Sequence, residues 1–189
     1  FPTHLGGRDI SFKLAGSGGD GAQTAALLLA RAAIEEGFDA THIPSYGPES
    51  RGGTSYADVH IAEQEVLNPA APDPHVLIAF NAPSLAKFAA SVREGGLILY
   101  DSTVIQELPP VPAGVRLIGV PFTALATNLQ RPVVKNIVAL GALQAATGLF
   151  PPETFLATIK TVHKDKPALL PLNEAAFAAG LRHTNIVPV

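Results

Sequence analysis

A glycine-rich stretch near the start of the chain carries residue types that bind anions. Gly16, Gly18 and Gly21 satisfy the pattern G-x-G-x-x-G, with Ser17 and Gly19 between them. A β-prone segment precedes this stretch, and a run of strong helix formers follows it. Glycines at such a turn let the backbone approach a phosphate, while the free N–H groups of the first helical turn and the helix dipole favour its charge. The pattern fits a phosphate or pyrophosphate site, and it equally fits a tight turn that only allows close helix–sheet packing.

A second candidate is Arg51, which lies in a loop punctuated by proline and glycine. The run Ser45-Tyr-Gly-Pro-Glu-Ser-Arg-Gly-Gly53 places small residues on both sides of this arginine. A guanidinium in such surroundings can fork onto a phosphate or a carboxylate. A solvated loop arginine is the alternative, and the loop alone favours that alternative.

Several other chemistries lack their residues in this sequence. The chain has no cysteine, so no thiol nucleophile and no thiolate ligands for zinc or iron–sulfur clusters are available. The histidines are dispersed without metal-ligand spacing, and no G-x-S-x-G nucleophile elbow occurs. Gly19-Asp20-Gly21 matches the start of a thiamine-diphosphate motif, but the asparagine pair that completes the motif is missing. We therefore expect no catalytic residues and no metal ligands in this chain.

Composition limits the remaining classes of protein. With 189 residues and 47% hydrophobic content, the chain can bury one sizeable core, which predicts a single domain. Only 15% of residues are charged and the formal net charge is −3, so a nucleic-acid partner is not expected. No apolar run reaches the ~20 residues that span a bilayer, and no signal peptide is recognisable. We expect a cytoplasmic protein that has no membrane partner.

Strands and helices are predicted to alternate along the chain. The strands are expected at 10–14, 39–43, 55–61, 75–80, 96–100 and 115–120. The helices are expected at 23–36, 83–93, 123–129, 132–147, 152–162 and 174–181. Together they predict an α/β fold, a three-layer α/β/α sandwich around a mostly parallel, Rossmann-like sheet. The strand at 55–61 follows a glycine loop without a crossover helix, so it is predicted to pair antiparallel.

The ends of these strands are where a site is expected, because ligands of open α/β sheets bind beyond the carboxyl ends of the strands. The glycine turn and the Arg51 loop both follow strands. Asn81 and Ser84 also follow a strand, but they are expected to cap the next helix. Asp101 ends another apolar strand, and its carboxylate is expected to satisfy loop backbone rather than a ligand. Asn173 is expected to cap the last helix.

The glycine turn and the Arg51 loop together resemble the gamma subunit, or gamma domain, of the 2-oxoacid:ferredoxin oxidoreductases. The run from Pro44 to Tyr56 is the most specific part of the resemblance. Two later segments, 131–143 and 172–180, are similar to the family in the same order. The resemblance covers nearly the whole chain and implies one gamma-type domain over residues 1–189. Asp20 departs from the pattern, since family members often carry glutamine there, and a carboxylate beside a phosphate repels it unless it points away.

The resemblance implies a part in oxidative decarboxylation of a 2-oxoacid to acyl-CoA, with electrons passed to ferredoxin. Thiamine diphosphate and the iron–sulfur clusters are then expected only in partner subunits. Those partners are thiamine-diphosphate-binding alpha and beta subunits and a ferredoxin-type subunit, arranged as a dimer of hetero-oligomers. This chain is expected to contribute to assembly and to the coenzyme A site. The residues that the resemblance implies for coenzyme A binding are Gly16, Ser17, Gly18, Gly19, Gly21, Arg51 and Asn136.

Two alternatives remain open from the residues alone. One is a free-standing Rossmann-type oxidoreductase that binds NAD(P), which needs an acidic residue near the end of the second strand. That strand ends at His42-Ile43-Pro44, and its acidic residue, Asp39, stands at its start. The other is a purely structural assembly subunit whose glycine loops pack against partners. An assembly subunit is expected to expose an apolar patch, formed by the Tyr46–Tyr56 loop and the C-terminal helices.

Overall fold

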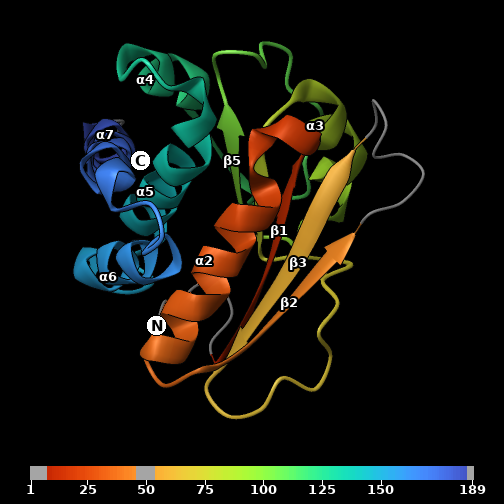
Figure 1. The fold of residues 1–189 in the computed structure, drawn as a ribbon. Helices are drawn as coiled ribbons and strands as arrows, with labels where there is room; N and C mark the ends of the chain where they lie inside the picture. The colour runs from red at the N-terminus through yellow and green to blue at the C-terminus, as the bar shows by residue number, and fades with distance from the viewer. Residues whose placement is uncertain (1–7, 46–53, 187–189) are drawn as a thin grey trace.

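A computed structural model describes residues 8–45 and 54–186 of the chain. Its centre is a six-stranded sheet in the order β2-β3-β1-β4-β5-β6 (Figure 1). The strands are β1 (Asp9–Gly16), β2 (Asp39–Ser45), β3 (Ser55–Ala62), β4 (Val76–Ala79), β5 (Leu97–Asp101) and β6 (Arg116–Val120). The helices are α2 (Ala22–Glu35), α3 (Ala82–Phe88), α4 (Phe122–Asn128), α5 (Lys135–Thr147), α6 (Pro152–Val162) and α7 (Leu170–Ile186).

The sheet is mixed, with one reversed strand. β1, β4, β5 and β6 pair in parallel, whereas β3 runs antiparallel to both β1 and β2. The antiparallel pairing predicted for 55–61 is therefore confirmed. Its cause is local, because the connection from Ser45 to Ser55 is shorter than the roughly twelve residues that a parallel crossover requires.

Helices cover both faces of the sheet and so make the three predicted layers. α3 packs on one face over Leu77 and Ile98, in a small apolar cluster. α2 and α5 pack on the other face over Phe12, Leu14 and Ile78, in a larger cluster to which α6 and α7 also contribute. Figure 1 shows α4, α5, α6 and α7 gathered on the side of the molecule away from α3. β4 is buried along its whole length, as its continuous apolar run predicts.

α5 and α7 cross at two glycines. A Cβ added to Gly141 would lie 2.1 Å from the carbonyl oxygen of Phe177, and one added to Gly180 would lie 2.0 Å from that of Val138. The two late segments that resemble the family therefore pack directly on each other. Their glycines allow backbone-to-backbone contact that no side chain permits.

Two predictions about local structure are wrong. α7 begins at Leu170 instead of Glu174, so Asn173 lies inside the helix and does not cap it. The expected long helix at 83–93 is α3 followed by a 3-10 turn, Ala89–Ser91. His60 in β3 is 9% exposed and contacts Asp9.

The expected apolar surface patch stays a prediction. Among the described residues, the large apolar side chains that are exposed are Ile34, Ile43, Leu67, Val104, Leu108 and Val133. None of these belongs to α6 or α7, while most of the Tyr46–Tyr56 loop lies outside the described residues. No helix in the described part of the chain is both long and apolar enough to cross a bilayer.

Candidate functional site

The glycine turn lies at the point where the sheet topology reverses. After β1 the chain passes through the turn into α2 on one face, and after β4 it passes into α3 on the other. β1 and β4 are parallel neighbours, so their carboxyl ends meet at a topological switch point. The turn is thus at the position where ligands of open α/β sheets bind.

Gly18 and Gly19 present open backbone at this position. Both are exposed and belong to a 3-10 turn, Gly18–Asp20, that leads into α2. A Cβ added to either glycine meets no atom of the described residues within 4 Å. The N–H groups of a first helical turn have no acceptor within the helix. Space and free donors therefore coincide at these two residues.

Asp20 directs its charge into the protein. Its Oδ2 accepts hydrogen bonds from the N–H of Ser17 (2.7 Å) and from the Ser17 hydroxyl (3.0 Å). Its Oδ1 forms an ion pair with Lys135 at the start of α5. Asp20 is only 6% exposed, and its carboxylate packs against Gly16. The negative charge beside the turn is therefore neutralised by Lys135 and turned away from Gly18 and Gly19.

Gly16 and Gly21 are required by packing. A Cβ on Gly16 would lie 2.6 Å from the Asp20 Oδ2 and 2.9 Å from the Phe80 Cβ. Gly21 has a φ of +79°, and a Cβ there would lie 2.8 Å from the Asn136 Nδ2. The two explanations of the glycine pattern therefore apply to different glycines. Gly16 and Gly21 allow close packing, whereas Gly18 and Gly19 are open and fit a phosphate site.

Asn136 supports the turn from behind. Its Nδ2 donates a hydrogen bond to the Gly21 carbonyl at 3.3 Å, and its Oδ1 accepts one from the N–H of Ile137 at 2.9 Å. The residue is 8% exposed. Both ends of its amide are engaged within the chain, and a contact between Asn136 and coenzyme A stays a prediction.

Arg51 lies outside the described residues, but the strands that carry its loop are held by Gln23. The Gln23 Nε2 donates to the carbonyl of Tyr56 in β3 at 2.9 Å. The His42 Nε2 in β2 donates to the Gln23 Oε1 at 3.2 Å. Burial lowers the pKa of His42 below its usual 6.5, which favours the neutral ring, and this contact requires that ring to carry its proton on Nε2. Gln23, two residues after Gly21, thus ties the glycine turn to both ends of the loop. Sequence reasoning missed this residue, because nothing local marks its partners.

Asn81 and Asp101, the other polar residues that follow strands, form hydrogen bonds within the chain, as predicted. The Asn81 Oδ1 accepts a hydrogen bond from the N–H of Ser84 at 3.0 Å and so caps α3. Asp101 is fully buried, and its carboxylate accepts from the N–H of Thr103 and from both the N–H and the hydroxyl of Thr123. Neither side chain is free to bind a ligand.

A buried ion pair that the sequence did not indicate lies next to the site. Lys13 in β1 and Asp58 in β3 pair at 2.8 Å between nitrogen and oxygen, with the Lys13 Nζ 4.4 Å from the centre of the Tyr56 ring. The second oxygen of Asp58 accepts the N–H of Ala71 at 3.0 Å. The pair therefore joins β1 and β3 to the segment that leads into β4.

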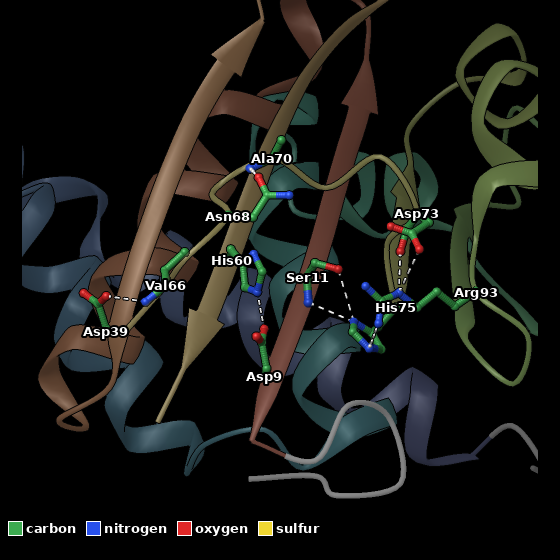
Figure 2. A network of polar contacts seen from close by, with 10 residues as sticks. All are labelled: Asp9, Ser11, Asp39, His60, Val66, Asn68, Ala70, Asp73, His75 and Arg93. Atoms are coloured by element: carbon green, nitrogen blue, oxygen red, sulfur yellow. Dashed lines mark hydrogen bonds and ion pairs between the residues drawn. The ribbon is translucent and has the colours of Figure 1, made fainter. Parts of the chain in front are cut away.

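A separate polar network lies at the other end of the sheet, where β1, β2 and β4 begin (Figure 2). The His75 Nδ1 lies 3.0 Å from the backbone nitrogen of Ser11, and its Nε2 lies 3.0 Å from the Arg93 guanidinium. Burial, and secondarily the charge of Arg93, lower the pKa of His75 to about 4. The Asp39 Oδ2 accepts the N–H of Val66 at 2.8 Å at this same end. Within the described residues no group of three or more acidic or histidine side chains is placed to hold a metal ion.

Sequence comparison places this fold among known oxidoreductase subunits. The family model described as pyruvate ferredoxin/flavodoxin oxidoreductase matches residues 11–183. The chain is 39% identical over 175 residues, 92% of its length, to the ketoisovalerate oxidoreductase subunit VorA of Methanothermobacter marburgensis, but it spans only 36% of that relative. It is 33% identical over 144 residues to the 2-oxoglutarate synthase subunit KorC of Methanocaldococcus jannaschii, a match that covers 75% of this chain and 77% of the relative.

Solved structures show the same architecture. The gamma subunit of the keto/oxoacid ferredoxin oxidoreductase from Geobacter sulfurreducens superposes with a TM-score of 0.82 at 30% identity, covering 94% of this chain and 99% of that one. A 2-oxoglutarate:ferredoxin oxidoreductase from Magnetococcus marinus, solved with 2-oxoglutarate, coenzyme A and succinyl-CoA bound, gives a TM-score of 0.86 at 22% identity. That match covers 96% of this chain and 32% of the other, and at this identity it shows a shared fold.

Proposed function

Because the chain belongs to the pyruvate ferredoxin/flavodoxin oxidoreductase family, we propose that it is the gamma-type part of a 2-oxoacid:ferredoxin oxidoreductase and contributes to its coenzyme A site. The enzyme would decarboxylate a 2-oxoacid oxidatively, form acyl-CoA and pass the electrons to ferredoxin. Thiamine diphosphate and the iron–sulfur clusters are assigned to partner subunits. This assignment agrees with the absence of cysteine, because thiolates are the usual ligands of such clusters.

The observation that carries the proposal is the open backbone at Gly18 and Gly19. A phosphate group of coenzyme A fits such a cradle, because each glycine leaves free the space that a Cβ would fill. The helix that follows adds its dipole, and the ion pair between Lys135 and Asp20 removes the repulsion that a free carboxylate would exert.

The chain's own residues then bind and orient the cofactor. Backbone N–H groups of Gly18 and Gly19 donate to phosphate oxygens, and Arg51 adds a charge-assisted contact from the adjoining loop. Gln23 positions the strands from which that loop departs. Coenzyme A supplies the thiol that accepts the acyl group, and the role of this chain is to hold its nucleotide end.

The NAD(P) alternative has little support from the site. Its ribose-binding carboxylate should stand near the end of the second strand. Asp39 stands instead at the start of β2, where its carboxylate accepts the N–H of Val66.

The proposal is tested on the assembled enzyme with the substitution Arg51→Ala. A charge-assisted contact contributes roughly 1.5–3 kcal/mol to binding. Its loss should therefore raise KM for coenzyme A about ten- to a hundredfold. Thiamine-dependent decarboxylation with an artificial electron acceptor should be unaffected. Arg51→Lys should restore only part of the loss, because an ammonium lacks the bidentate fork.

Arg31→Ala is the matched control, since Arg31 is an exposed arginine further along α2. It should leave KM for coenzyme A unchanged. Equal loss of both half-reactions in Arg51→Ala would make Arg51 an assembly residue and would remove it from the coenzyme A site.

A further inference from the structure

A small cavity lies between the C-terminal end of α6 and the start of α7. Its volume is about 150 Å³, and its apolar lining comes from Ile159, Pro167 and Leu170. The glycine turn contributes nothing to this lining. The cavity is therefore a feature independent of the proposed coenzyme A site.

The rim of the cavity is cationic. Lys160, Lys164 and Lys166 line it and are exposed. No ion pair ties any of these three lysines to another described residue. The exposed carboxylate of Asp165 belongs to the same segment but does not line the cavity. In a chain with a net charge of −3, this rim is a local site of positive charge.

Asn173 also lines the cavity, and the residue is 6% exposed. Asparagine offers one acceptor and two donors, which match the N–H and C=O groups of a peptide backbone.

The size of the cavity selects the kind of ligand. Pockets for small molecules typically enclose about 300–1,000 Å³, so this one suits a single apolar side chain. Interfaces often place one such anchor in a pocket and surround it with charged groups. We propose that the cavity docks an acidic segment of a partner protein, with one aliphatic or aromatic side chain inserted between α6 and α7.

The test is an NMR titration of the isotope-labelled full chain with a synthetic peptide. The peptide carries one phenylalanine flanked by two aspartates and two glutamates. Amide shifts should be confined to residues 159–173, and raising the salt concentration should weaken binding. A matched peptide with alanine in place of phenylalanine should bind about ten- to a hundredfold more weakly.

Charge reversal at the rim separates docking from chance binding. The double variant Lys160→Glu with Lys164→Glu should lose peptide binding, while Lys87→Glu on α3 should bind the peptide normally. All three lysines are exposed, so the folds should persist, and the spectra of the free variants check this.

Three outcomes would overturn the proposal. One is the absence of shifts at about millimolar peptide, and another is binding that survives the rim reversal. The third is that inorganic phosphate or acetate shifts the same residues as strongly as the peptide, which would make the cavity a small-anion site.

Discussion

The ion pair between Asp20 and Lys135 determines the net charge beside the glycine turn. The pair is largely buried, with side-chain exposures of 9% and 17%. A buried carboxylate that loses its cation is strongly destabilising, whereas removing both charges together is often nearly neutral. Removing one charge of this pair should therefore lower the free energy of unfolding.

Lys135→Met should lower the free energy of unfolding by about 3 kcal/mol, at the lower end of the range for buried pairs because Lys135 keeps some access to water. The double variant Lys135→Met with Asp20→Asn should recover most of that loss, as measured by urea unfolding. Lys160→Met, at an exposed position, is the control and should change little. A double variant as unstable as the single one would show that the ion pair is not what stabilises the turn.

His75 makes stability depend on pH. Its pKa is about 4 in the folded chain against the usual 6.5, so the unfolded chain binds the proton more readily. The free energy of unfolding should therefore fall as the pH is lowered from about 6.5 to about 4. His75→Gln should flatten this part of the profile in unfolding measurements at pH 7, 5.5 and 4.5. Parallel losses in the variant and the native chain would assign the pH dependence to other groups.

At the scale of elements, the crossing of α5 and α7 is set by Gly141 and Gly180. An alanine methyl at either glycine would meet backbone atoms that cannot move without separating the helices. Gly141→Ala should destabilise the chain by about 1–3 kcal/mol or more. Gly19→Ala, where the added methyl meets only open space, should stay within about 0.5 kcal/mol. Thermal unfolding of both variants checks the contrast, and equal stabilities would mean that the crossing has room to adjust.

Local sequence signals predicted the elements well and the contacts between them poorly. The apolar runs of β4 and β5 and the short connection before β3 predicted a mostly parallel sheet with one antiparallel strand. The last helix was expected to start at Glu174, but α7 starts at Leu170 and includes Pro171 in its first turn, where proline is tolerated. The pairing of Asp20 with Lys135 and the contacts of Gln23 depend on tertiary packing of residues far apart in the chain, and no local pattern encodes that.

At the scale of the whole molecule, α6 carries opposite charges at its two ends. Glu153 lies in its first turn and Lys160 in its last, as the helix dipole favours. A cavity of about 350 Å³ near Glu153 is also lined by Glu35 and Glu36, whereas the cavity near Lys160 has a cationic rim. Neither cavity is lined by a residue of the glycine turn. The proposed coenzyme A site and the proposed docking cavity therefore do not overlap.

The open face of Gly19 is the proposed contact to coenzyme A. It is tested most directly by the Kd for coenzyme A of the assembled enzyme carrying Gly19→Leu, determined by calorimetry beside the native enzyme. Gly19 is not in the left-handed region and its Cβ position is empty, so the variant should fold and assemble normally. We expect the Kd to rise about tenfold or more, because the leucine blocks a charge-assisted contact worth roughly 1.5–3 kcal/mol. An unchanged Kd in a correctly assembled variant would contradict the account and place the coenzyme A site elsewhere in the enzyme.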